Sequence, residues 1–258
     1  MTEPVATAGD APPEINTVSF ADLSAALRAG GRDFVRAPMY GLFFALVYVL
    51  GGWLVFWALT TKGQIWWTLP AAAGFPILGP FIACGLYEVS RRIEKGEPLD
   101  WPGVLGVIFR QKDRQIPSMA VVIVVFFLFW NFIAHMIFAL FMGLQVMTDI
   151  SSSFTVFLTP NGIAFLVVGT LVGAAFAAVL YCLTVVSLPL LLDREVDFVT
   201  AMIVSFQTVL QNPVVMLTWG VIIAGMLFVG MLPGFLGLFI VLPVLGHASW
   251  HVYRRALD

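Results

Sequence analysis

Residues 118–144 read SMAVVIVVFFLFWNFIAHMIFALFMGL and contain no Asp, Glu, Lys or Arg. A helix needs about 20 apolar residues to cross the hydrocarbon core of a bilayer, so this segment predicts a membrane-spanning helix. Five further apolar segments predict five more spans. The six predicted spans are 39–60, 66–88, 118–144, 161–192, 214–231 and 233–252.

The composition of the whole chain points to the same class. Of 258 residues, 60% are hydrophobic and 11% are charged. A soluble domain of this length cannot bury so much apolar surface, so the sequence predicts an all-α membrane protein with several spans. The net charge of −2 argues against a nucleic-acid partner. Both cysteines, Cys84 and Cys182, lie in apolar segments and are expected to pack as small side chains.

The basic residues orient the predicted spans. Twelve of the 13 Lys and Arg residues fall in the segments that join even to odd spans or in the terminal regions, and Lys62 lies on the opposite side. Lys and Arg near spans are retained in the cytoplasm, so both termini are predicted to be cytoplasmic. Residues 1–18 lack the features of a signal peptide and are expected to form a disordered tail before a membrane domain at 19–258.

A short amphipathic segment that ends in proline precedes the first, third and fifth spans. These segments, 19–38, 100–117 and 197–213, are predicted to form cytoplasmic helices at the membrane interface, each followed by a two-helix hairpin. The motifs PFIACGLYEVSRR (80–92) and PVLGHASWHVYRR (243–255) share a register. We therefore expect three parallel repeats, 19–92, 99–192 and 197–255, although Arg-Arg pairs at cytoplasmic helix ends also arise by convergence.

Two polar residues stand on one face of the third span. Asn131 and His135 are spaced i,i+4 and are expected to face the bundle interior, as interhelical hydrogen-bond partners or as part of a proton or ligand pathway. No Asp, Glu, Lys or Arg lies at the centre of a predicted span, which argues against an ion-coupled transporter.

A second candidate pair lies near the cytoplasmic ends of the second and sixth spans. Glu88 holds the register position that His251 holds in the other motif, so they are predicted to form an interfacial polar pair if the outer hairpins meet. His247 and His251 are spaced to hold a metal ion, but no third ligand is apparent at their level. The sequence predicts no metal site, catalytic residue or cofactor.

Basic side chains of the first two amphipathic segments form a third candidate surface. They are expected to contact anionic lipid or to dock a partner protein. The residues are Arg28, Arg32, Arg110, Lys112 and Arg114.

The segment AGFPILGPFIACGLYEVSRRIEKGEPLDW (73–101) resembles a family of predicted bacterial integral membrane proteins, the domain of unknown function number 2189. The resemblance extends over about 40–250 and implies a bacterial inner (plasma) membrane location. Some relatives carry names that suggest cytochrome c oxidase subunit I, which implies a respiratory connection. However, an oxidase core requires six histidine ligands for two haems and copper, and this chain has three histidines.

The function expected from the sequence is non-enzymatic. The chain is interpreted as an accessory or assembly factor of a larger membrane complex such as an oxidase. The alternative is a small-molecule or lipid transporter whose cavity lies between the hairpins and is lined by Asn131 and His135.

Overall fold

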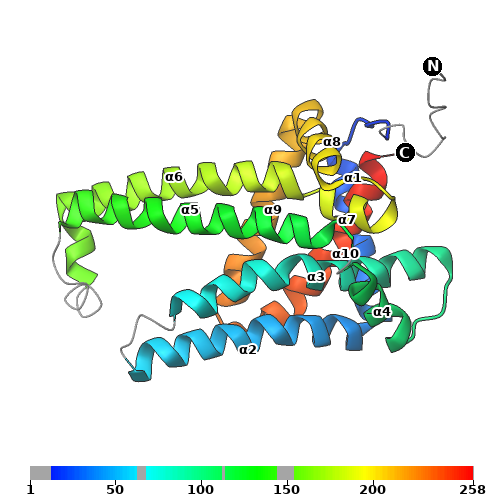
Figure 1. Cartoon of the computed structure of the whole chain (residues 1–258), viewed down its shortest axis with the longest axis horizontal. Helices are drawn as coiled ribbons and strands as arrows, with labels where there is room; N and C mark the ends of the chain where they lie inside the picture. Colours follow the sequence, from blue (N-terminus) through cyan, green and yellow to red (C-terminus); the bar gives the residue numbers. More distant parts are fainter. Residues whose placement is uncertain (1–12, 63–67, 112–113, 144–153, 258) are drawn as a thin grey trace, which may run out of the picture. The chain divides into compact units, whose positions relative to one another are not determined.

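The computed structural model describes residues 13–62, 68–111, 114–143 and 154–257 (Figure 1). Within these ranges the chain is helical, with one isolated bridge between Ile15 and Leu257 and no strand. The helices are α1 (Phe20–Arg36), α2 (Pro38–Lys62), α3 (Thr68–Lys95), α4 (Trp101–Gln111), α5 (Ile116–Met142), the 3-10 helix η2 (Phe154–Leu158), α6 (Pro160–Thr184), α7 (Ser187–Asp193), α8 (Phe198–Gln211), α9 (Pro213–Met231) and α10 (Leu238–Ala256).

Local signals in the sequence set where several helices begin. The side chains of Ser19 and Asp22 form a reciprocal capping box at the start of α1. Asp197 caps α8 by accepting hydrogen bonds from the amides of Val199 and Thr200. Proline stands at the first residue of α2 and of α9, where its missing amide leaves no hydrogen bond unmade.

The chain divides into two compact units. Unit 1 contains the residues up to 121 and from 182 onward, and unit 2 contains 122–181. In unit 1, α1 lies along α10, and α10 also packs on α2, α3 and α9 (Figure 1). A Cβ at Gly30 of α1 would lie 2.6 Å from the amide nitrogen of Ala248 in α10, so glycine permits this close approach.

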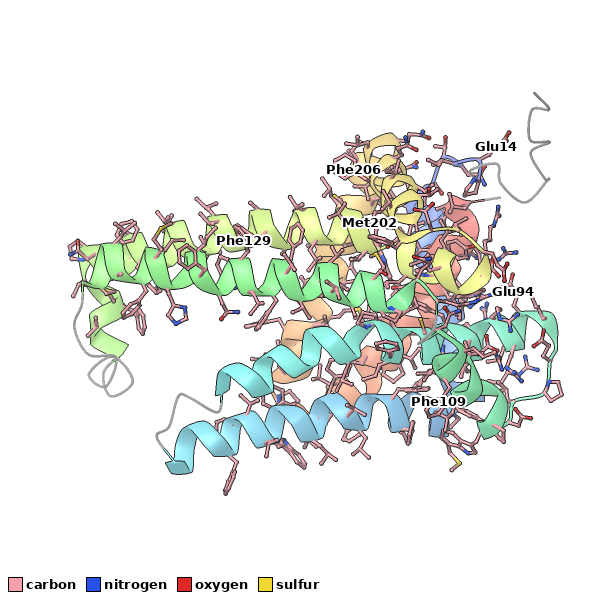
Figure 2. All side chains as sticks on the ribbon, viewed as in Figure 1. Glu14, Glu94, Phe109, Phe129, Met202 and Phe206 are labelled. Carbon is pink, nitrogen blue, oxygen red and sulfur yellow. The ribbon has the colours of Figure 1, made fainter. Side chains whose placement is uncertain are left out.

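Unit 2 is a hairpin of α5 and α6 joined by aromatic contacts. The ring centroids of Phe126 and Phe176 lie 6.3 Å apart, and those of Phe138 and Phe165 lie 5.6 Å apart. Many other side chains of the hairpin are exposed, such as Phe129, which is 60% exposed (Figure 2). The hairpin therefore presents a largely apolar surface.

The helices confirm a membrane protein with several apolar spans. Among the described residues, four segments are long and apolar enough to cross a bilayer: Pro38–Trp57, Ile116–Met142, Pro160–Asp193 and Pro213–Met231. They coincide with the first, third, fourth and fifth predicted spans. The helices α3 and α10, which contain the second and sixth predicted spans, are not among them. The six-span layout and the interfacial position of the short helices stay predictions.

The last residues of the expected tail, next to the membrane domain, make hydrogen bonds to other parts of the chain. Residues 1–12 lie outside the described residues, but the segment from Ile15 to Val18 is held in place. The amide of Asn16 donates to the carbonyl of Ala256 at 2.9 Å, and the amide of Val18 donates to Oδ1 of Asn212 at 2.7 Å. The side chain of Asn212, far away in the sequence, thus bonds the backbone of a segment whose composition is typical of disorder.

Candidate functional site

A buried polar cluster lies where α1, α3 and α10 meet in unit 1. It contains Asp33 of α1, Ser90 of α3, and His247 and His251 of α10. The carboxylate oxygen Oδ2 of Asp33 lies 2.9 Å from Ser90 Oγ and 2.7 Å from His251 Nε2. Ser90 Oγ also lies 2.8 Å from His247 Nδ1. Ser90 and His247 have no exposed surface, and Asp33 is 7% exposed.

The chemistry of the groups gives these hydrogen bonds a direction. An ionised carboxylate only accepts, so Asp33 accepts hydrogen bonds from the hydroxyl of Ser90 and from Nε2 of His251. Because the Ser90 proton points to Asp33, its oxygen accepts from Nδ1 of His247. The four side chains therefore form one continuous chain of hydrogen bonds across three helices.

This environment favours the charged form of Asp33. Burial by itself raises the pKa of the Asp33 carboxyl, but the hydrogen bonds from His251 and Ser90 outweigh burial and lower the pKa below its ordinary value. Positive charge on either histidine acts in the same direction. The cluster is thus an ionised carboxylate held by donors from two other helices.

The cluster contains Ser, His and Asp, the residue types of a serine hydrolase catalytic triad. However, these residues contact one another in a different order. In such a triad the histidine accepts the serine proton and donates to the carboxylate. Here Ser90 donates to Asp33 directly, and the histidine bonded to Asp33 is His251, whereas His247 contacts Ser90. With Ser90 fully buried, the arrangement fits a structural junction between helices better than a nucleophile.

Glu88 forms a separate buried centre two residues earlier in α3. Its carboxylate receives hydrogen bonds from Arg91 at 2.7 and 2.9 Å and from Nε of Arg92 at 2.7 Å. Arg92 also donates to the carbonyl of Pro98 at 2.8 Å, which fixes the turn after α3. Glu88 is therefore paired with arginines of its own helix, and His251 is paired with Asp33.

Two residues of the cluster, Asp33 and Ser90, did not emerge from the sequence as candidates. The buried face of α1 consists of Leu23, Ala26, Ala29, Gly30 and Asp33. A charged residue in the apolar periodicity of an amphipathic helix indicates a buried partner, and this signal was available in the sequence.

A cavity of about 450 Å³ opens beside Glu88. Its lining residues come from the ends of α3, α4 and α7 and from the start of the segment that leads into α5. They are Glu88, Arg91, Val107, Arg110, Gln111, Arg114 and Leu192. Arg110 and Arg114, two of the basic residues singled out in the sequence, are thus brought together with Arg91.

The other predicted basic contacts lie elsewhere or outside the described residues. Arg28 and Arg32 are exposed on α1, and Arg28 lies 3.5 Å from the hydroxyl of Ser24. Lys112 lies outside the described residues. The basic surface predicted from sequence is therefore divided between α1 and the cavity beside α4.

Asn131 and His135 both lie on α5 within unit 2. The amide of Asn131 donates to the carbonyl of Phe127 at 2.9 Å, and Nδ1 of His135 lies 2.7 Å from the carbonyl of Asn131. His135 is exposed and Asn131 is partly buried. An apolar groove of about 330 Å³ nearby is lined by Trp130, Ala134, Ile137, Phe165, Leu166, Gly169, Thr170 and Gly173.

The histidines and carboxylates of the described ranges are spread over several helices. Within them, no group of three or more His, Cys, Asp or Glu side chains is positioned to hold a metal ion.

Comparison with known proteins adds one match. Residues 68–193 match the sequence model of a family described as "Predicted integral membrane protein (DUF2189)". This confirms the family resemblance recognised from 73–101. No curated protein and no solved structure matches the chain. The family description and the four apolar spans agree on an integral membrane protein, and the respiratory connection stays a prediction.

Proposed function

We propose that this chain is a non-enzymatic accessory or assembly factor of a larger membrane complex, and that the α5–α6 hairpin contacts the partner. The observation that carries the proposal is the exposed imidazole of His135 within an otherwise apolar helix surface. The membrane is that of a bacterial cell, with both termini cytoplasmic, and a respiratory complex such as an oxidase is the first partner to test.

The position of His135 along α5 supports a depth within the lipid tails, because a helix of 27 residues, about 40 Å long, extends beyond the core at both ends when it is centred in the bilayer. At 1.5 Å per residue, His135 lies about 28 Å from the start of α5, and two further apolar turns follow it before Met142. The hydrocarbon core is about 30 Å thick. A fully apolar helix surface matches lipid, but an exposed imidazole at this depth does not.

The hydrogen bonding of His135 indicates the chemistry of what covers it. A carbonyl only accepts, so Nδ1 carries the proton that is donated to Asn131. The second ring nitrogen then offers a lone pair, which is unfavourable in hydrocarbon without a donor. A hydroxyl or amide donor on a partner's transmembrane helix satisfies it, which favours a protein neighbour over lipid.

The test is purification of the tagged chain from its native membranes in mild detergent, followed by mass spectrometry. We expect the wild type to recover subunits of one membrane complex in fixed stoichiometry. His135→Leu is expected to reduce that recovery several-fold, because an apolar side chain cannot accept the partner's hydrogen bond. Phe132→Leu, at a 69% exposed position on the same helix, is the matched control and is expected to retain the partner.

Two outcomes contradict the proposal. One is a wild-type chain that purifies without any partner in fixed stoichiometry. The other is an equal loss of partner in Phe132→Leu and His135→Leu. A partner-free chain whose reconstituted vesicles take up a solute in a manner that depends on His135 favours the transporter alternative.

A further inference from the structure

The cavity beside Glu88 combines groups of three chemical kinds. Arg91, Arg110 and Arg114 contribute guanidinium groups, Glu88 and Gln111 contribute acceptor oxygens, and Val107 and Leu192 contribute an apolar side. Its volume of about 450 Å³ lies within the range of roughly 300–1,000 Å³ usual for small-molecule sites.

The charges that line the cavity do not cancel. Glu88 is fully buried and is already neutralised by Arg91 and Arg92. Arg114 pairs with the exposed Glu195, whereas Arg110 has no ion-pair partner in the described part of the chain. Arg91 also lies 3.8 Å from Glu97, so the unpaired positive charge of the lining residues is that of Arg110.

Gln111 adds a buried hydrogen-bond acceptor to the residues that line the cavity. It is 3% exposed, and its side-chain oxygen Oε1 has no hydrogen-bond partner among the described residues. Burial of an acceptor without a donor is unfavourable. A ligand that carries a hydroxyl or ammonium group would remove this cost from inside the cavity.

We propose that this cavity binds a phosphate ester that also carries a hydroxyl or ammonium donor. The arginines hold the phosphate, because the planar guanidinium matches phosphate oxygens in a fork. Oε1 of Gln111 accepts from the donor of the ligand. Val107 and Leu192 contact the carbon skeleton that joins the two groups.

Two sources supply this chemistry: a phospholipid headgroup and a free phosphate ester. Phe109, next to Arg110, is 67% exposed and projects from α4 (Figure 2). An exposed aromatic beside a cation is typical of a helix at the membrane interface, which makes the headgroup the first source to test. The inference does not depend on the partner proposed above, since the cavity lies entirely in unit 1 and the test uses the purified chain.

The experiment is native mass spectrometry of the purified full chain in detergent with added phosphatidylglycerol, phosphatidylethanolamine or phosphatidylcholine. The first two carry hydroxyl or ammonium donors, and the third carries a phosphate but no donor. We expect one bound phosphatidylglycerol or phosphatidylethanolamine per chain and weaker retention of phosphatidylcholine. Glycerol 3-phosphate, titrated by calorimetry, tests the free phosphate ester.

Two variants separate the two halves of the site. Arg110→Gln is expected to weaken every phosphate ligand about tenfold, because one charge-assisted hydrogen bond is lost. Gln111→Leu is expected to remove the preference for donor-bearing lipids over phosphatidylcholine. Arg32→Gln removes the same charge from an exposed position on α1 and is expected to change affinity less than twofold.

The results distinguish ligand binding in this cavity from a general attraction of phosphate groups to the basic surface of the protein. Equal weakening by Arg110→Gln and Arg32→Gln, or equal retention of phosphatidylcholine and phosphatidylglycerol by the wild type, overturns the proposal. Binding of glycerol 3-phosphate with the same dependence on Arg110 and Gln111, without lipid retention, supports the site and assigns a soluble ligand. Thermal unfolding without ligand shows whether Gln111→Leu is folded, and Arg110→Gln, at an exposed position, tests the site independently.

Discussion

At the scale of single residues, Asp33 organises more of unit 1 than any side chain that the sequence singled out. Its carboxylate joins α1 to α3 through Ser90 and to α10 through His251. Burial of a carboxylate is unfavourable unless donors surround it, so its retention as a charged group requires all of these contacts. The junction should therefore be sensitive to the ionisation of one residue.

This gives a prediction about pH. The folded-state pKa of Asp33 is lowered, so its contribution to stability is complete above its unfolded pKa of about 3.9 and is lost as the pH falls through the lower folded value. At pH 7, Asp33→Asn is expected to lower the free energy of unfolding by about 1–3 kcal/mol. The difference from wild type should shrink below about pH 4.

Equilibrium unfolding in mixed micelles from pH 7 to pH 3 measures this difference. Asp22 and Asp197 also have lowered pKa values, owing to hydrogen bonds at the starts of α1 and α8, and they are present in both proteins. Comparison with Asp33→Asn therefore isolates the effect of Asp33. A difference that stays constant down to pH 3 contradicts a lowered folded-state pKa.

Residue patterns in the sequence located polar positions but did not identify their partners. Glu88 and His251 were singled out by a shared register, yet Glu88 bonds arginines three and four residues later and His251 bonds Asp33, 218 positions earlier. Helical spacing predicts contacts within a helix. Contacts between helices depend on packing, which one sequence does not specify.

At the scale of elements, the close packing of α1 on α10 depends on Gly30. A Cβ there would lie 2.6 Å from the amide nitrogen of Ala248 and 2.7 Å from the carbonyl oxygen of Val244. Both are backbone atoms, which cannot rotate away as a side chain can. The neighbouring Gly31 has no atom within 4 Å of the corresponding position.

This pair of glycines supplies a matched test. Gly30→Ala is expected to lower the free energy of unfolding by about 1–3 kcal/mol, because the helices must separate. Gly31→Ala is expected to be neutral or to stabilise by up to about 1 kcal/mol, since alanine favours helix. Detergent unfolding of both variants gives the comparison. Equal effects of the two substitutions contradict a close approach of α1 and α10.

The sequence predicted where several helices begin, whereas the break between α6 and α7 emerged from the structure. Prolines predicted the starts of α2 and α9, and the fourth predicted span contains a further proline, Pro189. The structure interrupts this segment between α6 and α7, because Pro189 lacks an amide to bond the carbonyl four residues earlier. Ser205 then bonds both the amide of Val186 and the carbonyl of Cys182, a contact that the sequence did not predict.

At the scale of the whole chain, the two ends of the described residues lie together. Ile15 pairs with Leu257, and Val18 bonds Asn212 at the start of α9 (Figure 1). Segments in direct hydrogen-bonded contact lie on one side of a bilayer, so the number of crossings between them is even. The six predicted spans satisfy this condition for both contacts, with six crossings between Ile15 and Leu257 and four between Val18 and Asn212. The four segments that are apolar and long enough by themselves would place three crossings between Val18 and Asn212, which is an odd number.

The distribution of basic residues then predicts which side this is and how many helices cross. With six spans, Glu14 and Lys95 face the cytoplasm and Lys62 faces the opposite side. If α3 does not cross, Lys95 stays on the side of Lys62. Single cysteines at these three positions, in a chain with Cys84→Ala and Cys182→Ala, are labelled with a membrane-impermeant thiol reagent in intact spheroplasts and after permeabilisation.

We expect the Lys62→Cys chain to react in intact spheroplasts, and the Glu14→Cys and Lys95→Cys chains to react only after permeabilisation. Labelling of Lys95→Cys in intact spheroplasts means that α3 does not cross and contradicts the six-span layout. It also places the guanidinium cavity beside Glu88 on the outer face, since Lys95 and Arg91 lie one turn apart at the end of α3. Labelling of Glu14→Cys in intact spheroplasts reverses the orientation altogether and contradicts the positive-inside assignment.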